Sequence, residues 1–275
     1  MSWRPVRRNR RIGSSPSRPK RAIVVGVLLI VITYAGFPTP RAEAATTFQA
    51  LTHNIAGFHD DEVRYITASS APLVVNVQEV CEYRYSDLVW HLGTRGYGTA
   101  AYIPRYNSTF CWGDVYMIHA TRGDFARTEG DVLAGSFPSS IQAAGDGARR
   151  GYVCVRAGIY YQSWWGCSTH ITPNSAYFAA AQSNHMRSIA FYLNDRAVIV
   201  GGDFNRLPDE PSMPEWYWSF HEGDERISER TQSRGKIDYV WSIRGRTNAA
   251  FGDAQVGCGG ISDHCYLLST HQFLP

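Results

Sequence analysis

Polar residues follow short apolar runs at several places in this chain. Asn54 ends the run TFQALTHN, Glu79 lies near the end of APLVVNVQEV, and Asp203 and Asn205 lie in AVIVGGDFNRLP. The other members of the set are His170 in WWGCSTHIT, Asp238 in KIDYVWS, and Asp263 and His264 just before CYLL. Because neighbouring strands of a sheet lie only about 5 Å apart, polar residues at strand ends can converge on one cleft.

Taken together, these side chains have the composition needed to hydrolyse a phosphate ester. Asp, Glu and Asn oxygens can hold a hard divalent cation, Mg²⁺ in the first place and Mn²⁺ or Ca²⁺ as alternatives, which neutralises phosphoryl oxygens. A carboxylate can orient or deprotonate the attacking water, and His or Asn can donate hydrogen bonds to the transition state. The sequence has no G-x-S-x-G motif, so no serine nucleophile of that type competes.

Each of these residues also has a structural explanation when it is considered alone. Asn54 can form a turn, Glu79 can be a solvated strand end, and an isolated His170 is more often a hydrogen-bonded structural residue than a catalyst. Asp238 is different, because it lies between Ile237 and Tyr239 in an apolar run. A carboxylate buried there is costly unless it is paired, so we expect a partner for Asp238.

The elements that must position this set alternate between strands and helices. The patterns predict helices over residues 60–69, 85–96 and 174–194 and a shorter one near 211–220. They predict strands over 47–54, 71–80, 197–202, 236–242 and 263–271, and antiparallel strands in GYGTAAYI, WGDVYMIHA, GYVCVRAGIYY and WWGCSTHIT. This order favours one α/β (α+β) domain over residues 45–275, with layers that include two sheets.

The first 44 residues have the order of a secretory signal peptide. A basic leader, RPVRRNRRIGSSPSRPKR, precedes the apolar run AIVVGVLLIVITYAG and then RAEAA, which contains a small-x-small cleavage site. An uncleaved membrane anchor is the alternative, and both place the body of the protein outside the cytoplasm. The first 45 residues hold nine basic residues and one acidic one, so the remainder carries 18 basic and 23 acidic residues. Binding to nucleic acid by charge alone is therefore not indicated.

All six cysteines lie in the part predicted to be exported, where an oxidising compartment permits disulfides. Cys154 and Cys167 flank a predicted hairpin, and Cys258 and Cys265 bracket a short loop, so each pair can close a bridge. By elimination Cys81 would pair with Cys111. No spacing of Cys and His residues indicates a zinc site.

The segments THNIAG, NVQEV, STHI, GGDFNRLP, KIDYVW and ISDHCYL, in this chain order, resemble the motif series of the endonuclease/exonuclease/phosphatase superfamily. The resemblance runs from about Thr47 to His271, and GDFNRLP is also similar to the corresponding segment of the cytolethal distending toxin nuclease subunit. It implies a DNase I-like fold, which is a four-layer sandwich of two mixed β-sheets flanked by helices. The site would then lie at the strand ends.

The resemblance also implies a role for each polar residue. Asn54, Glu79 and Asp263 would hold the metal, Asp203 would orient the water, Asn205 and His170 would contact the phosphate, and His264, oriented by Asp238, would stabilise the phosphoryl oxygens. The chain departs from the family at Asp114, where many members have Asn. The added negative charge leaves the substrate class open, unless Arg149, Arg150 or Arg156 offsets it.

Two substrate classes and one non-enzymatic role follow from this reading. The first is a secreted nuclease, a monomer that cleaves DNA with little sequence preference. The second is a phospholipid phosphodiesterase or phosphatase, if Trp164 and Trp165 and the cluster around Trp216 and Trp218 anchor at a membrane; buried packing of these rings is the alternative. The third is an exported binding domain, which the retention of every polar position in the set disfavours.

Overall fold

The structure is a computed structural model, and it describes residues 46–57, 59–103, 111–122, 131–145, 147–159, 162–223, 230–249, 255–258 and 262–274. Residues Ala42–Pro275 form one compact unit. The predicted leader over residues 1–44 lies outside the described residues. Among the helices that are described, none has the length and apolar character needed to cross a membrane.

The first sheet contains both strands that carry predicted metal ligands. Its strands are β1 (Thr47–Gly57), β2 (Val74–Cys81), β3 (Tyr97–Tyr102), β4 (Val115–Arg122), β11 (Thr247–Ala249), β12 (Gln255–Gly257) and β13 (Tyr266–Phe273). The order across the sheet is β11-β13-β1-β2-β4-β3, with β12 also paired to β13. β1 and β2 run parallel, while β13 and β4 pair antiparallel on either side of them. The central strands therefore deliver Asn54 and Glu79 to the same edge.

The second sheet carries Asp203, Asp238 and His170 of the predicted site. Its strands, in the order β5-β6-β7-β8-β10-β9, are β5 (Val132–Ser136), β6 (Gly151–Ile159), β7 (Gln162–His170), β8 (Ala197–Asp203), β10 (Asp238–Ile243) and β9 (Phe220–Glu222). β7 and β8 run parallel, and β10 pairs antiparallel with β8. In this register Asp238 lies directly opposite Asp203, while His170 lies beside it on the other side.

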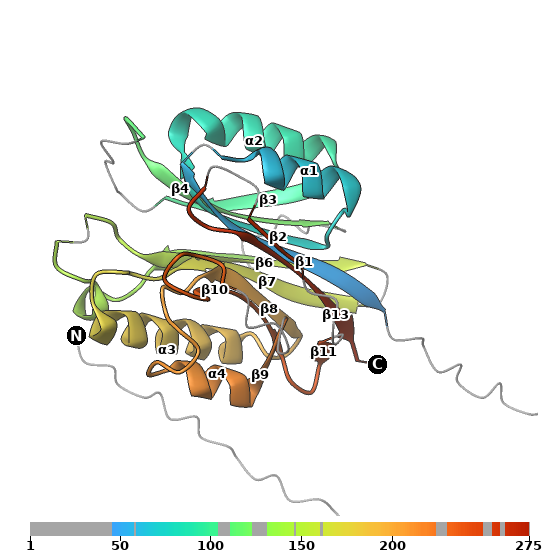
Figure 1. The fold of residues 1–275 in the computed structure, drawn as a ribbon. Helices are drawn as coiled ribbons and strands as arrows, with labels where there is room; N and C mark the ends of the chain where they lie inside the picture. The colour runs from blue at the N-terminus through green and yellow to red at the C-terminus, as the bar shows by residue number, and fades with distance from the viewer. Residues whose placement is uncertain are drawn as a thin grey trace, which may run out of the picture. The chain divides into compact units, whose positions relative to one another are not determined.

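Helices cover the outer face of each sheet (Figure 1). They are α1 (Asp61–Ser69), α2 (Glu82–Thr94), α3 (Ala176–Tyr192) and α4 (Met213–Ser219), with a 3-10 turn η1 (Ser139–Ile141). One hydrophobic cluster joins α1 and α2 to the first sheet, a second joins α3 and α4 to the second sheet, and a third fills the space between the sheets. The predicted four-layer sandwich of two mixed sheets is confirmed.

The patterns miss the shortest strands. β9, β11 and β12 have three residues each, and β5 is an edge strand with no fully buried residue. Such segments bury too little apolar surface to give a period-2 signal. α2 begins at Glu82, three residues before its predicted start, because it follows β2 without a connecting loop.

The three disulfides pair as predicted. Cys81 bonds to Cys111, Cys154 bonds to Cys167 across the β6–β7 hairpin, and Cys258 bonds to Cys265. Two of these bridges lie close to predicted site residues in the sequence, since Cys81 is two residues from Glu79 and Cys265 adjoins His264. The bridges therefore constrain the backbone beside the site.

The proposed membrane anchoring by the Trp164–Trp165 hairpin is wrong. Trp164 and Trp165 are 1% and 7% exposed, and Trp164 Nε1 donates a 3.3 Å hydrogen bond to Thr121 Oγ1 in the other sheet. Trp216 is also fully buried, and only Trp218 of this group is strongly exposed. The rings fill the core, where their large apolar surface stabilises the packing of the layers.

Polar side chains also cross between the two sheets. Gln78 Nε2 donates to Ser168 Oγ at 3.1 Å, and His271 Nδ1 lies 2.9 Å from Ser242 Oγ. A shift of one sheet over the other would leave these buried groups without partners, which is costly. The hydrogen bonds therefore fix the position of one sheet, and of its site residues, against the other.

Candidate active site

Strand ends from both sheets meet at one place in the molecule. Asn54 in β1 and Glu79 in β2 come from the first sheet, and His170, Asp203 and Asp238 come from β7, β8 and β10 of the second. His264 lies just before β13. The contacts described below join these six residues, so the structure brings together most of the set that the sequence predicts.

Irregular backbone aims the two side chains of the first sheet. The β1–β2 register shifts after Asn54, and the β2–β4 register shifts between Val77 and Val80. Glu79 lies within the second of these irregularities and has a φ of 56°, in the left-handed region that non-glycine residues rarely adopt. Bulges re-aim side chains next to active sites, and strain of this kind clusters at functional positions. Nothing in the sequence signals this conformation.

Asp203 is at the centre of the contacts and is 1% exposed. Its Oδ2 accepts a 3.1 Å hydrogen bond from Asn54 Nδ2, and its Oδ1 accepts a 2.8 Å hydrogen bond from the backbone N–H of Asn205. His170 Nε2 and His264 Nε2 lie 3.4 and 3.7 Å from Oδ2. The carboxylate is thus placed by both sheets at once.

The environment of Asp203 favours its protonated form. Burial, and after it the negative charge of Asp238, raise the pKa of Asp203 from 3.8 to about 7, while His264, Asn54 and the Asn205 amide act in the opposite direction. A carboxylate with a pKa near neutrality can accept a proton during a reaction and release it again. Asp203 therefore has the properties of a general base.

Asp238 has the partner that its position in the sequence requires. Its Oδ2 lies 2.9 Å from His264 Nδ1, and its backbone N–H donates a 3.0 Å hydrogen bond to Thr231 Oγ1. Burial opposes a charge on His264, but Asp238 and then Asp203 outweigh it and raise the pKa of His264 to about 10. The imidazole is therefore a cation at neutral pH, with Nδ1 on Asp238 and Nε2 toward Asp203.

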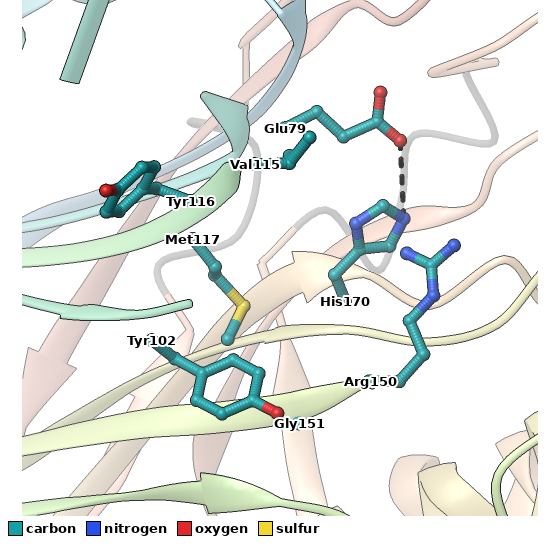
Figure 2. Close-up of a pocket in the computed structure, with 8 residues that line it drawn as sticks. All are labelled: Glu79, Tyr102, Val115, Tyr116, Met117, Arg150, Gly151 and His170. Atoms are coloured by element: carbon teal, nitrogen blue, oxygen red, sulfur yellow. Dashed lines mark ion pairs between the residues drawn. The ribbon is translucent and has the colours of Figure 1, made fainter. Parts of the chain in front are cut away.

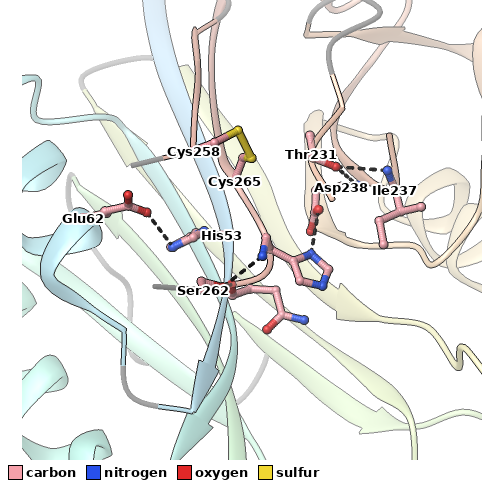
Figure 3. The surroundings of a disulfide bond; sticks show 10 residues. His53, Glu62, Thr231, Ile237, Asp238, Cys258, Ser262 and Cys265 are labelled. Atoms are coloured by element: carbon pink, nitrogen blue, oxygen red, sulfur yellow. Dashed lines mark hydrogen bonds and ion pairs between the residues drawn. A yellow bond between two sulfur atoms is a disulfide. The ribbon is translucent and has the colours of Figure 1, made fainter. Parts of the chain in front are cut away.

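The loop that carries His264 is fastened at several points (Figure 3). Ser262 Oγ donates a 2.8 Å hydrogen bond to the Asn54 carbonyl and accepts a 3.1 Å hydrogen bond from the His264 N–H. The Cys265 N–H donates to the Thr231 carbonyl at 2.7 Å, and Cys265 is also tied to Cys258. These contacts hold the imidazole at a fixed place beside β1 and β10.

His170 lies between two carboxylates and beside a cation. Its Nε2 is 3.6 Å from Glu79 Oε1, and both residues line a small pocket with Arg150 (Figure 2). The remaining walls of the pocket are Tyr102, Val115, Tyr116, Met117 and Gly151. Burial, followed by the charges of Arg150 and His264, holds the pKa of His170 well below 6.5, so a neutral ring can donate Nε2–H to the carboxylates.

Arg150 is the site residue that the sequence could not place. Gly151, the next residue, lies opposite His170 in the β6–β7 register, which brings Arg150 to the strand end. Arg156 forms a 2.6 Å ion pair with Asp131 instead, and Arg149 is exposed. One feature of the sequence could have placed Arg150. If GYVCV and STHI pair in a hairpin, Arg150 comes to lie at the same strand end as His170.

Asn205 and Asp263 have fewer contacts with the other predicted site residues. Asn205 has a φ of 48°, and its Nδ2 donates one hydrogen bond, of 2.9 Å, to the Ile171 carbonyl, which leaves the second amide hydrogen for another acceptor. Asp263 is exposed, and its Oδ2 accepts a 3.4 Å hydrogen bond from Gln232 Nε2. The structure does not bring the Asp263 carboxylate into the contacts around Asp203.

The motif resemblance implies that Asp263 and Glu79 both hold a metal, and replacement of each residue tests that expectation. Asp263→Asn should change the Mg²⁺ concentration for half-maximal activity by less than about 3-fold, because its carboxylate bonds to Gln232 and lies outside the contacts around Asp203. Glu79→Gln should raise that concentration by at least about 10-fold, as loss of a metal-site group does. Titration of activity with Mg²⁺ for both variants tests this. An equal rise of the half-maximal Mg²⁺ concentration in the two variants would indicate that Asp263 also holds the metal.

Two separate groups of residues offer oxygen or nitrogen ligands for a cation. Asp203, Asp238 and His264 offer atoms that all lie within 4.8 Å of one another. However, His264 is a cation held by Asp238, and a protonated imidazole is not a ligand. The Asn54 oxygen and the Glu79 carboxylate, which is 40% exposed, are better suited to a hard divalent cation.

No protein-family model matches the chain, and no curated protein matches it either. Solved structures do match. An endonuclease/exonuclease/phosphatase from Beutenbergia cavernae DSM 12333 has a TM-score of 0.66 and 17% identity, over 82% of this chain and 72% of that one. The human Nocturnin catalytic domain with bound sulfate has a TM-score of 0.62 and 16% identity, over 84% and 98% of the two chains.

A third match is ANGEL2, described as a 2′,3′-cyclic phosphatase and solved with adenosine-2′,3′-vanadate. Its TM-score is 0.61 and its identity 13%, over 83% of this chain and 96% of that one. At these identities the comparison concerns the fold. The chain therefore has the fold of the endonuclease/exonuclease/phosphatase proteins, as its ordered motifs predict.

Proposed function

We propose that this protein is a secreted, metal-dependent phosphodiesterase that cleaves DNA with little sequence preference. The observation that carries the proposal is the buried Asp203 carboxylate, which lies among Asn54, His170 and His264 with a pKa raised to about 7. The fold supports it, because proteins of the same fold include a 2′,3′-cyclic phosphatase and proteins described as endonuclease/exonuclease/phosphatase.

The donor set suits a divalent cation such as Mg²⁺, with Mn²⁺ and Ca²⁺ as alternatives. Asn54 and Glu79 would hold the cation, and Glu79 has a half-exposed carboxylate whose one close partner among the described residues is His170. Asp238 Oδ1 is buried and has no hydrogen-bond partner in the described part of the chain, which leaves negative charge near the site. When bound, the cation would neutralise charge on the phosphoryl oxygens.

The other catalytic roles belong to side chains of the chain itself. Asp203 Oδ2 accepts the proton of the attacking water as the water oxygen bonds to phosphorus, and the cationic His264 donates Nε2–H to a phosphoryl oxygen as charge develops. The P–O bond to the leaving oxygen breaks in the same step, and that oxygen takes up a proton from solvent. Asp238 holds the His264 ring in the required orientation through Nδ1. The second amide hydrogen of Asn205, the Nε2–H of His170 and the Arg150 guanidinium contact the phosphate from the other side.

DNA is favoured over a lipid headgroup as the substrate. The aromatic hairpin that would have anchored the protein at a membrane is buried in the core, which removes the main support for the lipid alternative. Arg150 supplies a local positive charge for a phosphate diester, although the exported part of the chain carries more acidic than basic residues. A phospholipid phosphodiesterase or phosphatase is the second candidate, and the assay below distinguishes the two.

Removal of the metal is expected to abolish activity. The purified protein with 5 mM Mg²⁺, on the order of ordinary assay conditions for such sites, should nick plasmid DNA and leave sphingomyelin vesicles and phosphoinositides intact. EDTA should stop the reaction and Mg²⁺ in excess should restore it. Cleavage that survives EDTA, or no cleavage of any phosphate ester, would reject the proposed mechanism, and release of lipid headgroups alone would favour the second candidate.

Export is part of the same proposal. Three disulfides within the described residues support an oxidising compartment, in which such bridges persist. Residues 1–44 would be the signal peptide, so that the mature chain starts near Ala45. The N-terminal sequence of the protein recovered from culture medium tests this assignment, since an uncleaved anchor would instead leave the chain in the membrane fraction.

A further inference from the structure

A second surface feature lies near Glu79 and is not used by the proposed mechanism. Residues 111–114 form a short loop beside the start of α2, and Trp112 in this loop is 94% exposed. Tyr83, in the first turn of α2, is 61% exposed. Together with Glu82 and Cys111, the two rings line one shallow cleft. Large aromatic side chains are usually buried, so two exposed rings in one cleft need an explanation.

The loop is held in a fixed conformation. Cys111 is bonded to Cys81 at the end of β2, the Glu82 N–H donates a 3.0 Å hydrogen bond to the Asp114 carbonyl, and the Asp114 N–H donates a 3.3 Å hydrogen bond to Glu82 Oε2. Trp112 itself has a φ of 49°. Packing of the Trp112 ring does not cause this conformation, because the ring is in solvent. A rigid backbone that presents an exposed ring is suited to binding a ligand.

The same disulfide places the loop close to the candidate active site. Glu79 precedes Cys81 by two residues, a distance of about 7 Å along a strand. The Cα atoms of Cys81 and Cys111 are 5.2 Å apart, and Trp112 is the next residue. At about 3.4 Å per nucleotide in a stacked strand, these steps leave the Trp112 backbone within about five nucleotides of Glu79.

The charges around the cleft identify the part of a substrate that fits it. Among the described residues that line the cleft there is one carboxylate, Glu82, and no Lys or Arg. This carboxylate repels a phosphate and equally repels an anionic membrane surface. A flat, uncharged base suits the cleft, since its face stacks on the rings and its amino groups can donate to the Glu82 carboxylate.

We propose that Trp112, together with Tyr83, stacks an unpaired base of a single-stranded nucleic acid whose phosphate is bound at the candidate active site. The inference rests on the proposed function, and it adds a preference for DNA that is single-stranded near the cleaved bond. A base in a duplex has both faces covered by its neighbours and cannot stack on a protein ring. The protein should therefore cleave single-stranded DNA in preference to duplex DNA.

Three oligonucleotides test this inference: a single-stranded 20-mer, about the length of a few such sites, its duplex, and a single strand of abasic nucleotides. For the single strand, Trp112→Ala should raise KM by about 5- to 150-fold, the factor expected for one stacked base. In this variant the KM for the single strand should no longer be lower than the KM for the abasic strand. Trp112→Tyr should retain most of it, because a smaller ring still stacks.

Trp90→Ala is the matched control, since Trp90 is 68% exposed on the same helix as Tyr83 but outside the cleft. It should keep the wild-type KM for all three substrates. A wild-type KM in Trp112→Ala, or an equal rise on the abasic strand, would overturn stacking while cleavage by the wild type upholds the nuclease. Weaker binding of Trp112→Ala to phosphatidylcholine vesicles, with KM unchanged, would assign the ring to a lipid surface.

If the wild type cleaves none of the three with Mg²⁺, the proposed function itself fails and the inference with it.

Discussion

Asp203→Asn is expected to lower kcat by at least about 10³-fold and, at the same time, to raise the melting temperature above neutral pH. Loss of the general base and of its charge accounts for the first effect. The second follows from the raised pKa of Asp203, since burial and Asp238 disfavour the carboxylate that the folded protein must hold above pH 7. An active site that stores such repulsion gains stability when it is neutralised.

The sign of this effect depends on pH. The pKa of Asp203 is about 7 in the folded protein against 3.8 for the ordinary group, so folding is penalised from about pH 4 upward and the penalty is complete above pH 7. An amide removes a penalty on the order of 2–4 kcal/mol at pH 8 and much less at pH 4.5.

Thermal unfolding of wild type and variant at the two pH values measures the difference, which should amount to several degrees more at pH 8. Asp195→Asn is the control, because Asp195 is an exposed aspartate that pairs with Arg196 away from the site. An Asp203→Asn variant that is less stable at pH 8 than the wild type would contradict the expected repulsion between Asp203 and Asp238.

Asp238→Asn is expected to lower kcat/KM at pH 8 by about 10²- to 10³-fold, the usual effect of disturbing a transition-state donor. Asp238 is the main reason that the pKa of His264 is about 10 rather than 6.5. A histidine with a raised pKa is a cation below that pKa and loses its charge above it. Activity that needs the cation should therefore fall near pH 10 in the wild type and at a much lower pH in the variant.

A pH profile of kcat/KM from pH 5 to 10.5 records both limbs. In the wild type the acidic limb should lie at or below about pH 7, because Asp203 must be ionised and a bound cation favours the ionised form. An alkaline limb that stays near pH 10 in Asp238→Asn would exclude His264 as the group that is charged during the reaction.

Asn54 and Asp203 could be placed from the sequence because each lies near the end of an apolar run, and the ends of neighbouring strands meet on one side of a sheet. The sequence predicts Asp238 inside a strand, and the structure places it at the start of β10. The cost of burying a carboxylate indicates that Asp238 needs a partner. The identity of that partner, His264, is implied only by the motif resemblance.

Other features depend on how distant segments come together. The positive φ of Glu79 arises from a register shift between β2 and β4, and Arg150 reaches the site only through the β6–β7 register. The exposure of Asp263 is decided by the local turn of a loop, although its neighbour His264 points inward. The sequence around Trp164 and Trp165 does not distinguish rings that are buried in a core from rings that anchor at a membrane.

The division of the candidate site between two sheets has a consequence for the stage of folding at which the site forms. Asn54 and Glu79 belong to one sheet and Asp203 and Asp238 to the other, so neither sheet alone can assemble the reacting groups. A chain whose two sheets have not yet packed together holds these groups far apart. The candidate site therefore forms only when the tertiary fold is complete.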